Sequence, residues 1–556
     1  MVEIKGKRES VIMKTILLGN DTKDVIDRKI KNYFNEHGLT SDNTNSYSIE
    51  FIEDNGQRLV KLTDSTQEIL LNYEKFLVDM EVILKEIKDE KRLQAVATAG
   101  MLSRSEGRVS EVYNKRKKYA SNVKVASNVV GYGHKTIAEH DYYVLALEDV
   151  TPIVEQTLIG YRLTSFTIKS RRNVDFRNVG FYVPDFKDAK GNILERNEEL
   201  QNTYIKYMKS LFAKYGEFVD CGIPVEDSRF VLPYCYYSNF VMGCDANELL
   251  RITSDLLYGK LSKITELNEL GKNLAKIICE NSPYLENSLK EEEKKKYYED
   301  KYAFVDTLLE KMDIQKGDDI QYNKSNVLNE VHLNKNTDSP DFEIICSFLQ
   351  AKYQMSYEKA LDYTAKMDDK TKSLIMQAIL HSKNNRELEQ VNFEFEIPID
   401  LATLTHITRH RMQSLLVPDF VPLWNLGNYV KPETIMKEHE KEYMEVFNNN
   451  KLMMDYFKSQ GVREEDLIYF YLSGNMCNIY TNMNGRELLW FSKMRCCNKA
   501  QWTIRKIANQ MVDDVREVSP LLAAGLGPSC ITESYCPEGK DSCKNRGVVV
   551  LKKELT

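Results

Sequence analysis

Residues 401–411 read Leu-Ala-Thr-Leu-Thr-His-Ile-Thr-Arg-His-Arg, an apolar run followed by three side chains that can carry positive charge. The run is typical of a buried strand. Cations at a strand end are well placed to bind phosphate, because a guanidinium presents a planar fork of donors to the oxygens. An exposed basic turn would show the same residues. Arg409, His410 and Arg411 alone therefore do not distinguish a phosphate site from a surface turn, and the rest of the sequence must decide.

This stretch has a counterpart earlier in the chain, and so do three landmarks that follow it. Each landmark recurs, in the same order, 237 to 249 residues later. The pairs are Gly160–Ser165 with Arg409–Ser414, Gly222–Asp227 with Gly461–Asp466, Asp245–Leu250 with Asn484–Leu489, and Ser282-Pro283 with Ser519-Pro520. A repeat of this length is a whole folding unit. The sequence therefore predicts two copies of one α+β unit, at residues 92–285 and 340–525.

The segments outside the repeat are less regular. Residues 1–91 are expected to form a small α+β extension of unknown role, with strands at 9–20 and 47–63 and a helix over 65–102 that begins at a Ser or Thr cap. The second strand-like segment has a tight turn at Asn55-Gly56. Residues 286–339 are rich in charge and asparagine, which predicts a partly helical connector. Residues 526–556 form a tail that contains cysteines.

Bulk composition excludes several classes of protein. The 556 residues are 42% hydrophobic and 29% charged, with a net charge of -7, so a soluble globular chain of several domains is expected. The negative balance gives no sign of a nucleic-acid or membrane partner. No stretch approaches the ~20 apolar residues that a membrane helix needs, and the first residues do not resemble a signal peptide. A cytoplasmic location with reduced cysteines is the expectation.

Three further motifs could carry chemistry, each with an ordinary alternative. In Gly133–His140, His134 and Thr136 could bind a cofactor; a zinc site is the alternative, but the spacing lacks a third ligand. Arg229 lies among apolar residues and needs an anionic partner, either Asp227 or a ligand phosphate. In residues 484–505 the apolar positions recur at helical spacing and are mostly core, including Trp502.

Taken together, these segments resemble the flavin-dependent thymidylate synthases. That family shows GHxSxxEH, RHR followed by a serine eight residues on, ARxxLP, NxR and an LR…AQWEIR helix. The first half of this chain keeps the GH motif, Ser170 with Arg172, and Arg229 in SRFVLP. The second half keeps the other motifs, namely Arg409–Arg411, Asn484 with Arg486, Arg495, and Ala500–Trp502.

The losses are complementary. The first half reads Gly160-Tyr161-Arg162 at RHR and has no AQW helix; the second half has Asn384, Asp419 and Ile468 at its GH histidine, serine and ARxxLP arginine. The family is a homotetramer with active sites between subunits. The resemblance therefore implies a pseudo-dimer in one chain, a composite site built from both halves, and a homodimer that mimics the tetramer.

The resemblance implies reductive methylation of dUMP to dTMP, with FAD as cofactor and NADPH and methylenetetrahydrofolate as co-substrates. Arg495 would act on the pyrimidine ring, and no metal is implied. The implied dUMP contacts are Ser170, Arg171, Arg172, Arg229, His406, Arg409 and Arg495. The implied FAD contacts are His134, Thr136, Arg409, His410, Arg411, Asn484 and Arg486.

Some positions depart from the family pattern. Its Asn-Glu pair reads Thr167-Ile168 in the first half and Leu416-Val417 in the second, and His406 replaces a glutamine. A flavoenzyme that modifies a related pyrimidine nucleotide and an inactive nucleotide-binding protein therefore remain alternatives. Cys496 and Cys497 adjoin the implied ring site but are interpreted as bystanders. Cys530, Cys536 and Cys543 could bind a metal or lie as free thiols in a surface tail.

Overall fold

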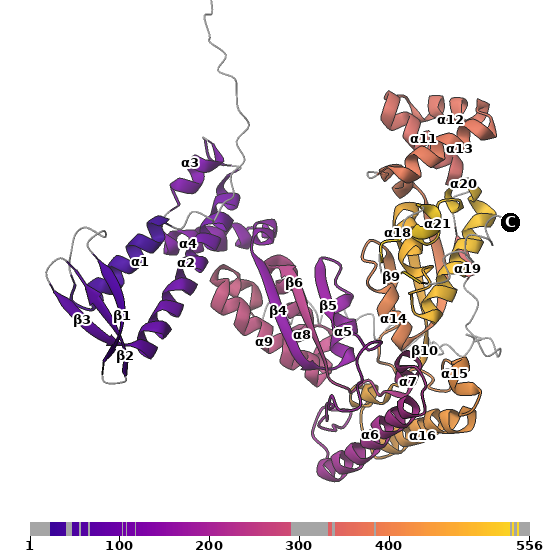
Figure 1. Ribbon diagram of the computed structural model, residues 1–556, viewed down its shortest axis with the longest axis horizontal. Coiled ribbons are helices and arrows are strands. Elements are labelled where there is room, and N and C mark those ends of the chain that lie inside the picture. Colours follow the sequence, from indigo (N-terminus) through magenta and orange to yellow (C-terminus); the bar gives the residue numbers. More distant parts are fainter. Residues whose placement is uncertain are drawn as a thin grey trace, which may run out of the picture.

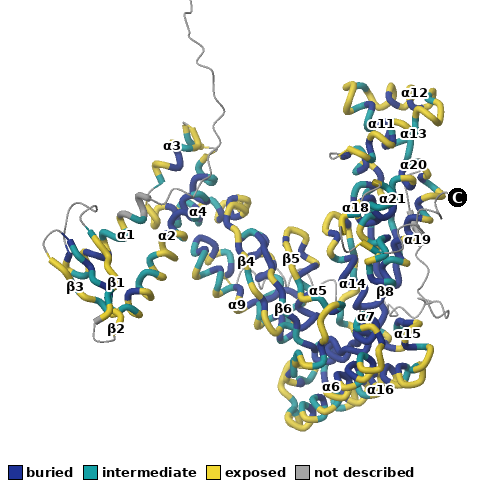
Figure 2. The backbone as a smooth tube through the Cα atoms, viewed as in Figure 1, coloured by how far each residue is buried: buried dark blue, intermediate teal, exposed yellow. Residues whose placement is uncertain are grey.

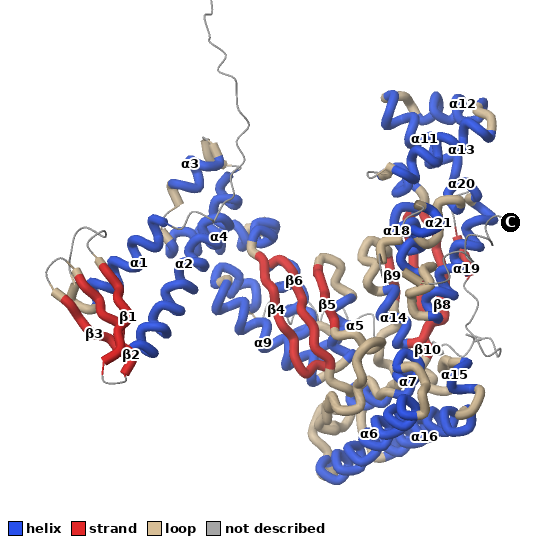
Figure 3. The backbone as a smooth tube through the Cα atoms, in the orientation of Figure 1, coloured by secondary structure: helices blue, strands red, loops and turns tan. Residues whose placement is uncertain are grey.

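The computed structural model describes residues 23–543, except for 40–46, 55–56, 65–66, 103, 107, 117, 291–331, 336–339, 383–384, 534–535 and 539–541. The strand expected at 9–20 and most of the expected connector lie outside these residues. Helices and three small sheets make up the described chain, as expected for α+β (Figure 3). None of the described helices is long and apolar enough to cross a membrane.

The N-terminal extension is a small sheet packed on two helices. It consists of α1 (Lys23–Glu36), β1 (Ser48–Asp54), β2 (Gln57–Thr63), β3 (Glu68–Asn72) and the start of α2 (Tyr73–Leu102). Val60 and Leu62 of β2 bury their side chains with Phe34 and Phe76 in a separate core. The expected hairpin is confirmed, since β1 pairs antiparallel with β2. The expected helix start at 65 is wrong: residues 68–72 pair with β2 as a strand, and the Asn72 side chain caps α2 by accepting from the Lys75 N–H.

The two repeated regions share one order of elements. The first contains α3 (Val109–Asn114), α4 (Tyr119–Gly131), η2 (Lys135–His140), β4 (Tyr142–Val150), α5 (Pro152–Ile159), β5 (Thr164–Ile168), α6 (Asn197–Asp220), α7 (Val225–Ser228), η3 (Arg229–Val231), β6 (Ser238–Asp245), α8 (Ala246–Tyr258), η4 (Lys260–Lys263), α9 (Thr265–Asn281) and η5 (Pro283–Leu289). Its sheet has the order β4-β6-β5, with both pairings antiparallel.

The second region repeats the run from β4 to α9. It contains β7 (His332–Lys335), α11 (Pro340–Tyr353), α12 (Tyr357–Lys366), α13 (Asp369–His381), η6 (Arg386–Gln390), β8 (Asn392–Asp400), α14 (Leu401–Ile407), β9 (Ser414–Leu416), α15 (Glu433–Met436), α16 (Glu440–Ser459), α17 (Glu464–Leu467), η7 (Ile468–Phe470), β10 (Met476–Asn484), α18 (Gly485–Arg495), α19 (Trp502–Val518), α20 (Pro520–Ala523) and α21 (Ser529–Thr532). Its sheet order is β7-β8-β10-β9. The strands β8, β10 and β9 occupy the places of β4, β6 and β5.

The apolar run before Arg409 is a helix, so the strand expected there is wrong. The strand β8 ends at Asp400, whose carboxylate accepts from the Thr403 N–H at 2.8 Å and starts α14. In the first half the corresponding apolar run before Gly160, which is equally strand-like in sequence, is also a helix, α5, and Pro152 occupies its first turn. A proline is favourable there because the N–H groups of the first turn have no partner within the helix, so the missing N–H of proline costs nothing.

The two regions pack on one another along a shared seam. Residues 229–236 lie beside residues 468–475, where the Tyr234 N–H donates to the Tyr471 carbonyl at 2.7 Å and the Ser473 N–H donates to the Leu232 carbonyl at 2.9 Å. One hydrophobic core contains residues of both regions. Figure 1 shows the result as two arms that meet where α6 and α16 lie, and Figure 2 shows dense burial at this junction.

Candidate functional site

The turn from α7 into η3 places Arg229 in the interior. Its guanidinium is buried, and its Nε–H donates to the Glu226 carbonyl at 3.1 Å. Its Nη2 is buried without a hydrogen-bond partner. Asp227, the protein partner considered from the sequence, binds other groups, since its carboxylate accepts from Trp502 Nε1 at 2.7 Å and from the Thr434 hydroxyl at 2.6 Å. Arg229 therefore makes no ion pair among the described residues.

The segment after β5 carries two neighbouring arginines with different roles. Arg171 is buried and pairs with Glu155 at 2.9 Å, with Tyr236 as a second partner. Glu155 raises the pKa of Arg171, although burial alone opposes the charge. Arg172 instead reaches the second half, where its Nη1 and Nη2 donate to the Lys499 carbonyl at 3.3 Å, while its Nε contacts Glu226 at 2.8 Å.

His406, on the last turn of α14, lies near enough to four arginines for their charges to act on it. Its ring is buried and its Nε2 has no hydrogen-bond partner. Burial lowers the pKa of His406 well below its ordinary value, and four nearby cations lower it further: Arg229, Arg495, Arg409 and Arg172. His406 is therefore neutral at pH 7, and two arginines from each half share its surroundings.

Arg495 ends α18 and is oriented by a histidine. Its Nε–H donates to His410 Nε2 at 3.0 Å, and His410 Nδ1 lies 3.1 Å from the Glu487 carboxylate. An Nε2 that accepts requires the proton on Nδ1, which then donates to Glu487; burial lowers the pKa of His410 and favours this neutral form. Burial and the charges of Arg409 and Arg172 lower the pKa of Arg495 to about 10.

Arg172 is paired with Glu226, but Arg229, Arg409 and Arg495 make no ion pair within the described part of the chain. Burial, followed by the charge of Arg171, lowers the pKa of Arg229 to about 10, although the nearby Asp400 carboxylate opposes this shift. Like charges held together at this depth disfavour one another unless an anion joins them. We call Arg172, Arg229, Arg409 and Arg495 with His406 the arginine site. Its composition suits a phosphate dianion.

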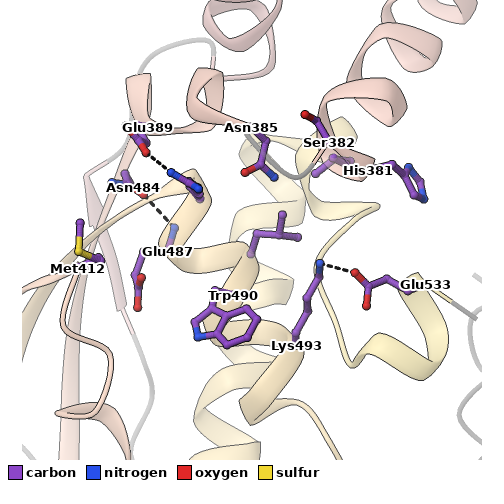
Figure 4. Close-up of a pocket in the computed structure, with 13 residues that line it drawn as sticks. His381, Ser382, Asn385, Glu389, Met412, Asn484, Glu487, Trp490, Lys493 and Glu533 are labelled. Atoms are coloured by element: carbon purple, nitrogen blue, oxygen red, sulfur yellow. Dashed lines mark hydrogen bonds and ion pairs between the residues drawn. The ribbon is translucent and has the colours of Figure 1, made fainter. Parts of the chain in front are cut away.

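The remaining residues predicted for the cofactor lie in two places. Arg411 crosses to the first half and donates to the Thr164 carbonyl. Asn484 caps α18 by accepting from the Glu487 N–H at 2.9 Å, and Arg486 pairs with Glu389 at 2.6 Å. Both line a pocket of about 590 Å³ in the second half, where Trp490 and Met412 supply apolar surface (Figure 4). Glu487 joins this pocket to His410 and thus to the arginine site.

His134 and Thr136 are not brought to this pocket within one chain. They follow α4 in an exposed segment. Figure 1 shows α4 on the opposite arm from α18. The set predicted to bind FAD is therefore divided between the two arms of the chain.

Several residues that shape the site were missed by the sequence analysis. Glu155 neutralises Arg171, Glu226 holds Arg172, and Glu487 fixes His410. Two of them were visible as members of the repeat, because Glu226 and Glu487 lie within its landmarks. Glu155 had no such signal, since a glutamate on a short helix is usually exposed.

The cysteines of the tail lie near the loop after α18. Burial raises the pKa of Cys530, and Cys497, Cys536 and Cys543 raise it further. The Cys530 thiol therefore stays protonated at neutral pH. Among the described residues no three His, Cys, Asp or Glu side chains are arranged to hold a metal ion.

The described chain thus contains two copies of one α+β unit, and arginines from both copies lie near His406. The sequence profile of the thymidylate synthase complementing protein family matches residues 83–283 and again 335–521. The chain therefore belongs to this family of enzymes, with its characteristic domain duplicated in tandem.

Individual relatives agree with this assignment. The flavin-dependent thymidylate synthase of Saccharolobus solfataricus is 34% identical over 183 residues, which span 31% of this chain and 68% of the relative. That of Sulfurisphaera tokodaii is 36% identical over 185 residues, spanning 31% and 69%. A crystal structure of the UMP/dUMP methylase PolB from Streptomyces cacaoi, bound with 5-Br dUMP, covers 35% of this chain and 93% of its own at 16% identity; its TM-score of 0.29 is too low to place residues.

The buried histidine gives a testable pH dependence. Because the pKa of His406 is lower in the folded chain than in the unfolded chain, the unfolded chain binds more protons as the pH falls below the ordinary value of 6.5. We therefore expect His406 to cost stability progressively as the pH falls from 7 to 5, by at most about 1.4 kcal/mol per pH unit. Asp400, whose pKa burial raises to about 6, has the opposite sign.

Thermal unfolding of the wild type and of His406→Gln at pH 7.5 and pH 5.5 isolates this contribution. Glutamine is the residue that the family carries here and does not titrate. The variant should lose less stability on acidification than the wild type. Equal losses in both proteins would show that His406 is not held neutral.

Proposed function

We propose that the chain methylates dUMP to dTMP at a site assembled from both of its halves. The observation that carries this proposal is the arginine site, in which Arg172 and Arg229 from the first half surround His406 together with Arg409 and Arg495 from the second. Three of these arginines, Arg229, Arg409 and Arg495, make no ion pair among the described residues, which suits the phosphate of a nucleotide. The family assignment and the names of the relatives supply the reaction.

Arg172 and Arg229 would bind the phosphate. The unpaired Nη2 of Arg229 is a buried donor that a phosphate oxygen would satisfy. Ser170, whose hydroxyl accepts from the Arg172 N–H at 3.3 Å, would complete this end. We assign Arg171 a positioning role, because its salt bridge with Glu155 holds the segment in place.

Arg495 would act at the pyrimidine ring. Its charge would stabilise negative charge that develops on the ring when C5 becomes nucleophilic, and His410 keeps its guanidinium in one orientation. His410 has its acceptor nitrogen towards Arg495 and its proton towards Glu487, so it cannot take a second proton without losing the Arg495 contact.

The pocket in Figure 4 fits part of a flavin cofactor, for which FAD is our proposal. Trp490 offers an aromatic surface, and Asn484 and Arg486 offer polar groups beside it. When bound, the flavin would supply the reducing chemistry of the reaction. NADPH and methylenetetrahydrofolate are proposed as co-substrates.

We further propose that two chains pair, so that His134 and Thr136 of one chain complete the flavin site of the other. Each chain would then act as a pseudo-dimer and the pair as a tetramer. Light scattering should give twice the mass of one chain, with at most one FAD per chain by absorbance. Two tightly bound FAD per chain would contradict the single composite site.

The decisive test of the function is product analysis. The purified chain with FAD, NADPH, methylenetetrahydrofolate and dUMP should yield dTMP, identified by chromatography and mass. A product with a different group at C5 would favour the related pyrimidine-modifying enzyme, a possibility raised by Ile168 at the position of the family's glutamate. Absence of any product, with dUMP bound, would leave a nucleotide-binding protein.

A further inference from the structure

A second pocket, larger than the one in Figure 4, lies between the two halves. It has a volume of about 810 Å³ and is lined by residues of both. From the first half it takes the segment around Gly160–Arg162 and the η4 segment. From the second it takes Val417–Pro422 and Glu465.

Several of the lining residues occupy repeat positions of the arginine site and of its neighbours. Gly160, Tyr161 and Arg162 correspond to Arg409, His410 and Arg411. Thr157 corresponds to His406, Asp419 to Ser170 and Glu465 to Glu226. The pocket is therefore the counterpart of the arginine site across the repeat, and both have persisted as structural features of the chain.

Its chemistry is different, because none of the four arginines recurs. Their positions hold Gly160 for Arg409, Val421 for Arg172, Ile468 for Arg229 and Leu256 for Arg495. Ile468 and Leu256 are fully buried in the hydrophobic core. A phosphate placed as in the arginine site would therefore meet no donor side chain at these four positions, and losing such partners is costly.

Aromatic and aliphatic surface replaces the lost charge. Tyr161 and Phe420 line the pocket together with Leu261, Ile264 and Val417. Around this surface the lining contains five cationic side chains and two carboxylates: Arg162, Arg251, Lys260, Lys263 and Arg411, with Asp419 and Glu465. Within the described residues Lys260 is paired with Asp419 and Arg251 with Glu248, whereas Arg162 and Lys263 make no ion pair.

We infer that this second pocket binds a planar aromatic anion that is not a nucleotide in the dUMP orientation. Its ring would lie on the apolar wall, and a carboxylate or sulfonate would meet Arg162 and Lys263. Because Thr408, His410 and Arg411 also line the pocket, an occupant would contact the segment that carries Arg409. The inference rests on the lining residues and does not require the proposed reaction.

Binding can be measured with a defined probe. The aromatic sulfonate 1-anilinonaphthalene-8-sulfonate becomes fluorescent when it enters an apolar site, and it is titrated into the full chain. Val417→Trp should weaken the saturable signal strongly, since the indole would occupy the apolar wall on which the ring of the probe would lie. Leu416→Trp is the matched control, because Leu416 is exposed and outside the lining; it should bind as the wild type does.

The charge requirement is tested with exposed residues. The double variant Arg162→Ala/Lys263→Glu should weaken probe binding about tenfold through loss of the anion contacts. Lys276→Glu, an exposed lysine on α9 outside the pocket, should leave it unchanged. This pair decides the question even if Val417→Trp does not fold, which circular dichroism would reveal.

Saturating dUMP should not displace the probe from the wild type. Competitive displacement by dUMP would place the probe in the arginine site and overturn the inference, as would wild-type probe binding by the double variant. Failure of the proposed reaction would leave these outcomes unaffected, because dUMP binding and dTMP formation are measured separately.

Discussion

Arg229→Ala should lower dTMP formation about 100-fold or more, because a charge-assisted contact to phosphate is lost from a desolvated site. The unliganded protein should nevertheless keep its melting temperature or gain a few degrees. The reason is that Arg229 is buried without an ion pair, and burial with Arg171 lowers its pKa to about 10. Removing a buried charge without a partner relieves a cost of folding.

Steady-state kinetics with dUMP and thermal unfolding with and without dUMP measure both effects. Arg229→Met is the variant matched in length, and it separates the charge from the space that the side chain fills. Dose-dependent stabilisation by dUMP should disappear in both variants. If Arg229→Met keeps near-normal turnover, Arg229 does not bind the substrate. If it unfolds at a much lower temperature, its role is structural.

Mixing Arg229→Ala with Arg495→Ala should restore no activity, although each variant alone loses most of it. Both arginines act on His406 within one chain, so a mixed dimer contains no site that has both. Were the site formed between chains, random pairing would return about a quarter of the wild-type activity. Subunit exchange is verified beforehand with differently tagged chains. An absence of recovered activity then cannot be due to a failure of the subunits to exchange.

A conservative variant distinguishes the role of Arg495 from general disruption of the site. Arg495→Lys keeps the charge but loses the Nε–H that donates to His410. It should retain dUMP binding while kcat falls, because the charge remains but its orientation does not. A higher KM with an unchanged kcat would assign Arg495 to binding alone.

The duplication and the complementary motifs were readable in the sequence, and the family profile matches both regions. The local secondary structure was harder to predict from the sequence. Residues 401–407 are buried throughout, and their mixture of Leu, Ala, Thr, His and Ile suits a buried strand as well as a buried helix. Only the cap at Asp400 resolves the choice. The strand at Glu68–Asn72 was hidden in a helical pattern because its stability comes from pairing with β2. The predicted domain boundary at 91 falls inside α2.

The sequence by itself determined which units and motifs the chain contains. It has two copies of one unit, and each copy retains the motifs that the other has lost. These are properties of short segments and survive without knowledge of the fold. Only the tertiary structure decided which side chains meet. Adjacent arginines diverge, Arg171 to Glu155 and Arg172 to the second half. Asp227 pairs with Trp502, 275 residues away, and leaves Arg229 unmatched. Burial and the packing of distant segments set these contacts, and neither is encoded in any local stretch of the chain.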